Sequence, residues 1–369
     1  MPVSAVDCVQ PAIQHTREQL FSHFRIGQWS RLALVGILAA EMHASGCNFG
    51  NFGQLLSQPP KRTNEFLSMP FPNIDPARIA QFAGLIAAML LLAVVVFFVF
   101  LYINSVFRFI LFDSVLRKEC SIGKGWQRWH RTGRRFFLWQ LVYAISTSMV
   151  LGLLIGIPLL FAVSAGWFKD SKSHIAGMVG GVIFLVGIVL IFALAAAIVQ
   201  MLAKDFLVPI MALENLDFAD GWSRLIGLMR GEPGKYAVYL LMKFVLSIAA
   251  AILFSIVAII PALVVIVPSV LIVLAGKAAG MGWSAATVSL AIIFGTMALA
   301  LLIYLVALVS VPATVFFPAY AMYFLAARYP NLGALLTPAP APPAPEAPPV
   351  LESPPPTPPP LPPSPEPIG

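Results

Sequence analysis

Long apolar runs separated by short polar segments dominate the pattern of this chain. Five of these runs cover residues 79–116, 136–166, 175–213, 236–276 and 286–327. Each is longer than the roughly 20 helical residues that cross a hydrocarbon layer of about 30 Å. In lipid the backbone satisfies its own polar groups only in helices or closed barrels, and uninterrupted runs of this length are typical of helices. The pattern therefore predicts an all-α fold, a polytopic bundle of transmembrane helices.

A sixth and weaker span is expected at residues 32–46, a short run that includes Glu41 and His43. Residues 1–31 precede it as an amphipathic or interfacial segment. Their apolar positions suit either a helix on the membrane surface or an ordinary helix packed on the protein. The expected transmembrane helical domain is 32–330. Residues 331–369 form a Pro-rich tail that we expect to be disordered, because such a composition cannot pack a core.

Several runs are longer than one crossing needs. Residues 79–116 would extend about 57 Å as a straight helix, so we expect a span at 79–104 and an elbow that turns into the interface from residue 106. Apolar segments that contain a proline, at 206–209 and 316–320, predict similar elbows after two later spans. Because proline interrupts helices, the expected helix-breaking positions are Pro158, Pro209, Pro261 and Pro318.

Two similar motifs indicate an internal repeat. The segments Gly125-Trp126-Gln127-Arg128 and Gly221-Trp222-Ser223-Arg224 lie 96 residues apart, and each leads into an aromatic-rich span. Duplicated halves are frequent in membrane folds. We therefore predict repeat units at about 79–166 and 175–276, with a partial third copy at 286–328. The alternative is chance similarity between apolar segments.

Composition and charge support a membrane protein and its orientation. The chain is 59% hydrophobic and 11% charged, whereas soluble domains carry about 25% charged residues. The net charge of +7 could attract nucleic acid, but in polytopic proteins Lys and Arg usually mark cytoplasmic loops. The basic loop at 117–135 therefore predicts a location in the cytoplasmic (inner) membrane with both termini cytoplasmic, and no nucleic-acid partner.

Candidate chemistry is sparse. Charged side chains at membrane depth are costly and tend to be functional, which makes Glu41, His43 and Lys243 the intramembrane polar candidates. Solvation at the interface is the simpler explanation for Glu41 and Lys243. The last apolar run has no charged residue before Arg328, which disfavours a proton or ion pump. Since no metal-binding or nucleophile motif occurs, we expect no metal and no cofactor, and the sequence does not favour an enzyme.

The basic, Trp-containing loop is the best candidate for a functional surface. Tryptophan and arginine at a membrane interface contact head groups, and arginine favours anionic ones. The residues predicted to bind lipid or a partner protein are Trp126, Arg128, Trp129, Arg131, Arg134, Arg135, Trp222 and Arg224. The alternative is that these charges serve only as a topological signal.

The order of span, elbow and Gly-Trp-x-Arg carries a resemblance. The segment Lys204-Asp205-Phe206-Leu207-Val208-Pro209, followed by Gly221-Trp222-Ser223-Arg224, resembles a group of bacterial membrane domains. That group includes the domain fused to some glycerophosphodiester phosphodiesterases and several related uncharacterised families. The resemblance implies a membrane domain of the six-helix type over about residues 79–328. It transfers no catalytic residue, because the phosphodiesterase barrel has no counterpart here.

Three functional hypotheses follow from these observations. The first is a non-enzymatic membrane module that binds membrane lipids, anionic ones in particular, or a membrane or cytoplasmic protein partner. The second is a small-solute transporter or channel built on the two-fold repeat, with Pro158 and Pro261 near a central site. The third and least favoured is a membrane-embedded enzyme acting on lipid, which only Glu41, His43 and the basic loop support.

Overall fold

In the computed structural model, residues 4–22, 24–39, 76–165, 175–280 and 284–336 are described, and every regular element among them is helical. In chain order the elements are α1 (Val9–Phe21), α2 (Ile26–Leu38), α5 (Pro76–Leu116), α6 (Ile122–Ser164), α7 (Ile175–Leu202), the π-helical turn η2 (Ala203–Leu207), α8 (Val208–Glu214), α9 (Phe218–Gly231), α10 (Pro233–Ala278), α11 (Ala285–Ala326) and α12 (Pro330–Leu336). The prediction of an all-helical fold is confirmed for these residues.

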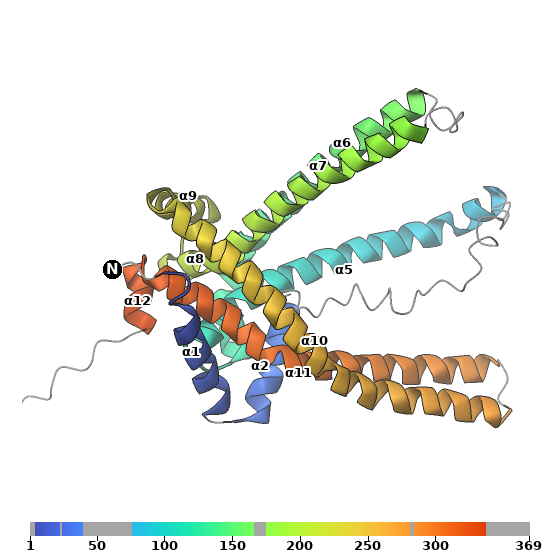
Figure 1. The fold of residues 1–369 in the computed structure, drawn as a ribbon. Helices are drawn as coiled ribbons and strands as arrows, with labels where there is room; N and C mark the ends of the chain where they lie inside the picture. Colours follow the sequence, from blue (N-terminus) through green and yellow to red (C-terminus); the bar gives the residue numbers. More distant parts are fainter. Residues whose placement is uncertain (1–3, 23, 40–75, 166–174, 281–283, 337–369) are drawn as a thin grey trace, which may run out of the picture.

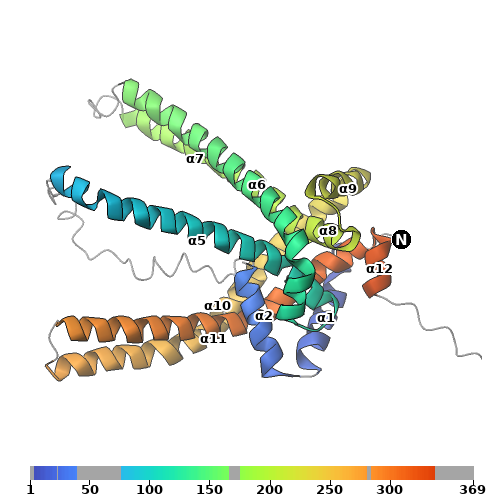
Figure 2. The ribbon, with the colours of Figure 1, turned by 180° about the vertical axis from the view of Figure 1, so that it is seen from behind.

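The helices form one hub from which three arms diverge (Figures 1 and 2). The arms are the outer part of α5, the pair α6–α7 and the pair α10–α11. We define the hub as the described residues within 4–39, 101–140, 200–243 and 302–336. The main apolar core lies in the hub, where α1 and α2 pack against α5 and α11 and the inner parts of the long helices meet.

The arms have the properties of membrane spans. Five helices are long and apolar enough to cross a membrane, and their most apolar stretches leave nearly all side chains exposed. No charged residue occurs in these helices within 79–103, 141–164, 175–203, 244–276 or 285–326. The exposed apolar stretch of α5 covers roughly 18 residues, or about 27 Å, close to the hydrocarbon thickness of about 30 Å. The outer parts of the helices are therefore suited to lipid, and their surplus length builds the hub.

The N-terminal helices belong to the hub. Helix α1 buries Ala12, His15 and Leu20, so of the two alternatives for this segment the structure has the packed helix. Of the apolar positions on α1, Ile13 and Phe21 are exposed. Helix α2 ends at Leu38, and its 13 residues are too few for a full crossing. The rest of the expected span at 32–46, with Glu41 and His43, lies outside the described residues, so a sixth span remains a prediction.

Of the four prolines expected to break helices, three lie inside continuous helices. Helix α5 continues through residues 106–116, and α11 continues through Pro318. Pro158 and Pro261 also lie inside continuous helices, α6 and α10. Interrupting a helix in hydrocarbon would leave backbone groups unsatisfied, at several kcal/mol each, about as much as the roughly 3 kcal/mol cost of a proline inside a helix. Pro209 lies in the first turn of α8, directly after the π-helical turn η2 that separates α8 from α7.

The two Gly-Trp-x-Arg motifs make similar local contacts. A Cβ atom on Gly125 would lie 3.1 Å from Ile110 Cγ1, and one on Gly221 would lie 2.7 Å from Leu207 Cδ1. Both glycines therefore allow a helix to pass closely over the preceding one. The surroundings differ, because α6 runs on into its arm whereas α9 ends at Gly231 and α10 begins anew at Pro233. The repeat as a whole remains a prediction.

Both described ends of the chain lie in the hub. Helix α1 and helix α12 are at the same end of the molecule, away from the tips of the arms (Figure 1). The expected Pro-rich tail at 331–369 begins later than predicted, because residues up to Leu336 form α12 and Leu332 is fully buried. Residues 337–369 lie outside the described part of the chain.

Candidate functional site

Four charged side chains gather where the arms join the hub. They are Arg108 on α5, Lys204 and Asp205 on the turn η2, and Lys243 on α10. Arg108, Asp205 and Lys243 are at most 8% exposed. We call these four residues the junction cluster. It lies next to the charge-free stretches of the arms, where an uncompensated buried charge would be costly.

Asp205 and Lys243 form a buried ion pair within this cluster. Lys243 Nζ lies 2.6 Å from Asp205 Oδ1 and 2.5 Å from Oδ2, and Tyr239 Oη donates a hydrogen bond of 2.9 Å to Oδ2. Tyr239 itself is fully buried and stacks on Tyr320. Lys243 does not extend toward solvent, because its amine points to the carboxylate of Asp205 on the turn η2 and the side chain is buried.

The second cation of the cluster, Arg108, is oriented by its own surroundings. Its Nε donates to Asn104 Oδ1 at 3.1 Å, and its guanidinium carbon lies 6.0 Å from the ring centre of Phe136. Asn104 in turn donates to the carbonyl oxygen of Leu38 at 3.0 Å, which ties α5 to the end of α2. These contacts fix the guanidinium before any ligand arrives, and this lowers the entropic cost of binding.

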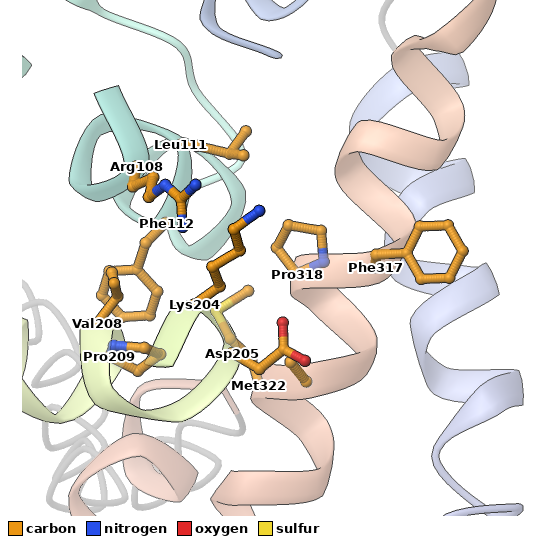
Figure 3. A pocket seen from close by; sticks show the side chains of 11 residues that line it. Arg108, Leu111, Phe112, Lys204, Asp205, Val208, Pro209, Phe317, Pro318 and Met322 are labelled. Carbon is orange, nitrogen blue, oxygen red and sulfur yellow. The ribbon is translucent and has the colours of Figure 1, made fainter. Parts of the chain in front are cut away.

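Two cavities share Arg108 and Lys204. A small pocket of about 30 Å³ lies between α5, the turn η2 and α11, and its lining includes Asp205 and Pro318. In Figure 3 the amine of Lys204 extends toward the side of this pocket where Arg108 lies, and the carboxylate of Asp205 lies below Pro318. A larger, open groove of about 430 Å³ lies between α2, α5, α6 and α7; its polar lining is Asn104, Arg108, Gln140, Gln200 and Lys204.

The tryptophans of the predicted surface lie against the hub instead of forming an exposed belt. Trp126 packs edge-on against Tyr102, with ring centres 6.0 Å apart, and Trp129 stacks on Phe109 at 5.9 Å. Trp222, the equivalent residue in the second motif, lies 6.0 Å from Trp139. The three side chains are only partly buried, and their role as lipid or partner contacts stays a prediction. Their rings contribute to the apolar core, since a large aromatic side chain gains most when it is buried.

The basic residues of the same surface differ in their contacts. Arg128 pairs with Asp113 at 3.4 Å and Arg135 with Asp217 at 3.0 Å, while Arg224 lies 3.8 Å from Glu214. Arg131 and Arg134 are exposed, and neither forms an ion pair with a described residue.

These two arginines lie close to the start of the apolar arm. Leu138, which is 53% exposed, follows Arg134 by four residues on α6, or about 6 Å along the helix axis. For comparison, lipid head groups add roughly 5–8 Å on each side of the hydrocarbon layer. Contact of Arg131 and Arg134 with head groups stays a prediction.

Sequence reasoning missed Arg108 and Asp205 as members of a site. The available signal was positional: each is a charged residue at the inner end of an otherwise charge-free apolar run. Glu41 and His43 cannot be compared with this cluster because they lie outside the described residues. Among the residues that are described, no group of three or more His, Cys, Asp or Glu side chains could hold a metal ion.

The divergence of the arms bears on the transporter hypothesis. Pro158 is near the outer end of α6 and Pro261 lies in α10, which belong to different arms (Figures 1 and 2). The arms separate toward their tips, so the outer parts of α6 and α10 do not lie side by side. The transporter hypothesis stays a prediction.

The helical hub with five apolar spans defines a polytopic helical membrane protein. Within that class the chain belongs to the Family of unknown function (DUF7544), whose family model matches residues 3–335. This match shows no link to glycerophosphodiester phosphodiesterases, and the resemblance to their fused membrane domain stays a prediction. Comparison with curated proteins and with solved structures finds no match.

Proposed function

We propose that this protein is a non-enzymatic module of the cytoplasmic membrane that binds anionic lipids through the basic side of its hub. One observation carries the proposal: Arg131 and Arg134 are exposed and lie within two helical turns of the start of the apolar surface of α6. Each Lys or Arg near an anionic membrane surface contributes about 1 kcal/mol of attraction. The charge-free arms support a binding role over ion transport, because a relay of carboxylates would be expected in a pump.

The orientation in the proposal rests on the distribution of charge. The exposed cations on α6 belong to the hub, and cytoplasmic segments of membrane proteins carry an excess of Lys and Arg. The hub would then face the cytoplasm, where the leaflet has a negative surface potential of about −30 mV. On this arrangement the basic surface and the anionic head groups lie at the same depth.

The test compares lipid selectivity in reconstituted vesicles. Spin-labelled phosphatidylglycerol and phosphatidylcholine report how strongly each lipid associates with the protein. For the double variant Arg131→Gln/Arg134→Gln we expect the preference for phosphatidylglycerol to fall by about fivefold or more, since one contact of roughly 1 kcal/mol corresponds to that factor. The preference of the wild type should also fall at 1 M NaCl, where the Debye length is about 3 Å.

A matched control removes the same number of charges farther from the membrane. Lys124 is exposed on the first turn of the same helix, about 15 Å along the axis from Arg134, and Arg230 is exposed at the end of α9. Lys124→Gln/Arg230→Gln should leave the selectivity unchanged. Equal selectivity in all three proteins, or equal losses in both double variants, would refute the proposal.

A further inference from the structure

Exposed aromatic side chains gather on the hub where α1 leads into α2. Phe21 is 58% exposed and Phe24 is 60% exposed. Among the described hub residues, these two are the aromatic side chains that are more than half exposed. Ile26, at the start of α2, is 70% exposed. The hub therefore presents an apolar surface that its own packed helices leave uncovered.

Trp29 on α2 orders this surface. Its indole N–H donates to the carbonyl oxygen of Leu20 at 3.3 Å. The ring centres of Phe21 and Phe24 lie 5.9 Å and 5.5 Å from that of Trp29, with interplanar angles of 79° and 58°. We call Phe21, Phe24, Ile26 and Trp29 the aromatic corner. Its rings are already held together, and a preformed surface lowers the entropic cost of binding. A contiguous exposed apolar patch usually marks an interaction site.

The aromatic corner has a charged rim with an excess of cations. Arg17 precedes it by one turn of α1, Arg25 lies within it, and both are exposed. The carboxylate of Glu18 is paired with Lys118 at 2.7 Å. The adjoining ends of α1 and α2 lie at the edge of the hub, away from the outer parts of the arms (Figures 1 and 2). A ligand for this corner therefore combines stiff apolar groups with negative charge and approaches from the hub side.

The chain carries a segment of this chemistry beyond α12. Residues 338–369 contain 17 prolines and three glutamates, and they contain no Lys or Arg. Two runs of three prolines occur at 354–356 and 358–360. Such a composition favours the polyproline II helix, which binds aromatic-lined surfaces with little loss of conformational entropy. The Pro-rich tail therefore matches the aromatic corner both in shape and in charge.

The tail is also long enough to reach the corner. His15 Nδ1 lies 3.3 Å from Tyr323 Oη, which ties α1 to the last turns of α11. Phe21 follows His15 by about 9 Å of helix, and the chain from Tyr323 to Leu336 spans at most about 30 Å because most of it is helical. Residues 337–354 cover about 56 Å as a polyproline II helix. The proline runs can therefore meet the corner of the same chain.

We propose that the Pro-rich tail docks on the aromatic corner of its own chain, with the proline rings of 354–360 against Phe21 and Phe24. The glutamates of the tail lie toward the arginines of the rim. The covalent tether gives the tail an effective concentration in the millimolar range, so a contact that would be weak between separate molecules is occupied here. The inference goes beyond the proposed function, because it concerns a contact within the chain in which no lipid takes part.

The distance between two spin labels tests the docking in the full-length protein. Gln10→Cys on α1 and Thr357→Cys in the tail are introduced together into a cysteine-free background, and the distance distribution is recorded by double electron–electron resonance in lipid nanodiscs. Gln10 is exposed and precedes Phe21 by about 17 Å along α1. A docked tail should therefore give a narrow main distance below about 40 Å. A tail that does not dock would give a broad distribution.

Two changes should release the tail. Phe21→Ser/Phe24→Ser should lower the docked fraction about fivefold or more, because the apolar contact is lost. A peptide of residues 338–369, added at about 10 mM to exceed the effective concentration of the tether, should release the tail from the protein with an unaltered corner. The peptide result excludes misfolding as the cause, since no corner residue is changed.

Ile13→Ser is the matched control, because Ile13 is an apolar residue of α1 outside the aromatic corner and is 54% exposed. It should leave the distance distribution unchanged, and an equal loss of docking in this variant would contradict a specific contact. A broad distribution in the protein with an unaltered corner would overturn the inference. A narrow distribution that neither the phenylalanine variant nor the peptide changes would also overturn it, and the membrane or another protein would then be the occupant of the corner.

Discussion

At the scale of residues, the junction cluster depends on one buried pair. Asp205 and Lys243 come from different long helices, and both are less than 10% exposed. Taking two charges out of water is costly, and their attraction compensates only when the geometry is good and further hydrogen bonds are made. Tyr239 supplies such a hydrogen bond to Asp205. The pair therefore fixes how the end of α7 docks on α10.

Removing one member of this pair should destabilise the protein more than removing both. Asp205→Leu or Lys243→Met alone leaves an uncompensated buried charge, and we expect each to lower the free energy of unfolding by about 3–5 kcal/mol. The double variant Asp205→Leu/Lys243→Met should recover most of that loss. Thermal unfolding of the four proteins in one detergent measures the coupling. Additive losses in the double variant would contradict a direct interaction between the two side chains.

His15 should make stability depend on pH. Its Nε2 donates to the carbonyl oxygen of Val115 at 2.9 Å, and its Nδ1 lies 3.3 Å from Tyr323 Oη. Burial is the main reason why the pKa of His15 is lowered from its ordinary value of 6.5, and the nearby Lys118 acts in the same direction. The unfolded chain therefore binds this proton more readily than the folded one, so the free energy of unfolding should fall as the pH drops below about 6.5.

The measurement compares thermal stability at pH 7.5 and pH 5.5 for the wild type and for His15→Gln. The glutamine keeps a donor for Val115 and does not titrate. The loss of stability at the lower pH should be smaller in the variant than in the wild type. Equal losses in both proteins would show that other groups cause the pH dependence.

At the scale of elements, close helix contacts rest on a few glycines. Helices α5 and α6 approach each other at Gly133, where an added Cβ atom would lie 2.7 Å from Val106 Cγ2 and 3.0 Å from Val106 Cα. Because one of these atoms belongs to the backbone of α5, the helix itself would have to move. Gly152 lies farther along the same helix, and an added Cβ atom there would meet no atom within 4 Å.

Gly133 and Gly152 should respond differently to substitution by alanine. Gly133→Ala should lower the free energy of unfolding by about 1–3 kcal/mol, the usual cost of overpacking. Gly152→Ala should be neutral or stabilise the protein by up to about 1 kcal/mol, because alanine is the better helix former. Chemical or thermal unfolding of both variants in the same detergent tests this. A destabilised Gly152→Ala with an unaffected Gly133→Ala would place the close contact elsewhere.

The helices also show which features of the fold and of the junction cluster could be predicted from the sequence. The spans were predictable because length and hydropathy are local properties of each run, and the exposed arms agree with them. The continuity of α10 through Pro261 and Pro268 could not be predicted from the sequence. A proline destabilises a helix, but breaking the helix in lipid would leave backbone groups without hydrogen bonds, which is also costly. The pairing of Asp205 with Lys243 was also unpredictable, since 38 residues and a change of helix separate them. A charge at the inner end of an apolar run was the one visible signal.

At the scale of the whole molecule, the described helices define two sides. Helices α6 and α10 run from the hub to the tips of the arms, and α5, α7 and α11 run back to the hub (Figures 1 and 2). The hydrogen bond from Asn104 to the carbonyl oxygen of Leu38 places the end of α2 in the hub. Pro76 begins α5 at its outer end, about 42 Å along the helix axis from Asn104. Leu38 and Pro76 therefore lie on opposite sides of this arrangement, and both described ends of the chain belong to the hub side.

Accessibility of single cysteines tests this arrangement. Burial raises the pKa of the Cys8 thiol to about 11 and also raises the pKa of Cys120, so both native thiols should react slowly with maleimides. The single cysteines are nevertheless introduced into the background Cys8→Ala/Cys47→Ser/Cys120→Ser, so that only the new thiol can be labelled. Gln10 and Leu335 are exposed positions of the hub near the two described ends of the chain, and Lys277 is exposed at the tip of α10; each is changed to cysteine alone. An impermeant maleimide should label the two hub positions from the same side of the membrane and Lys277→Cys from the other.

The assay uses spheroplasts and inverted vesicles in parallel, with detergent-solubilised protein as the control for reactivity. With the hub in the cytoplasm, the hub positions should react in inverted vesicles and Lys277→Cys in spheroplasts, because the basic surface of the hub follows the positive-inside bias. The reverse pattern would keep the fold and place the hub outside, which would remove the cytoplasmic anionic leaflet from the proposed function. Labelling of Gln10→Cys and Leu335→Cys from opposite sides would contradict the fold itself, since the hub holds both ends on one side of the arms.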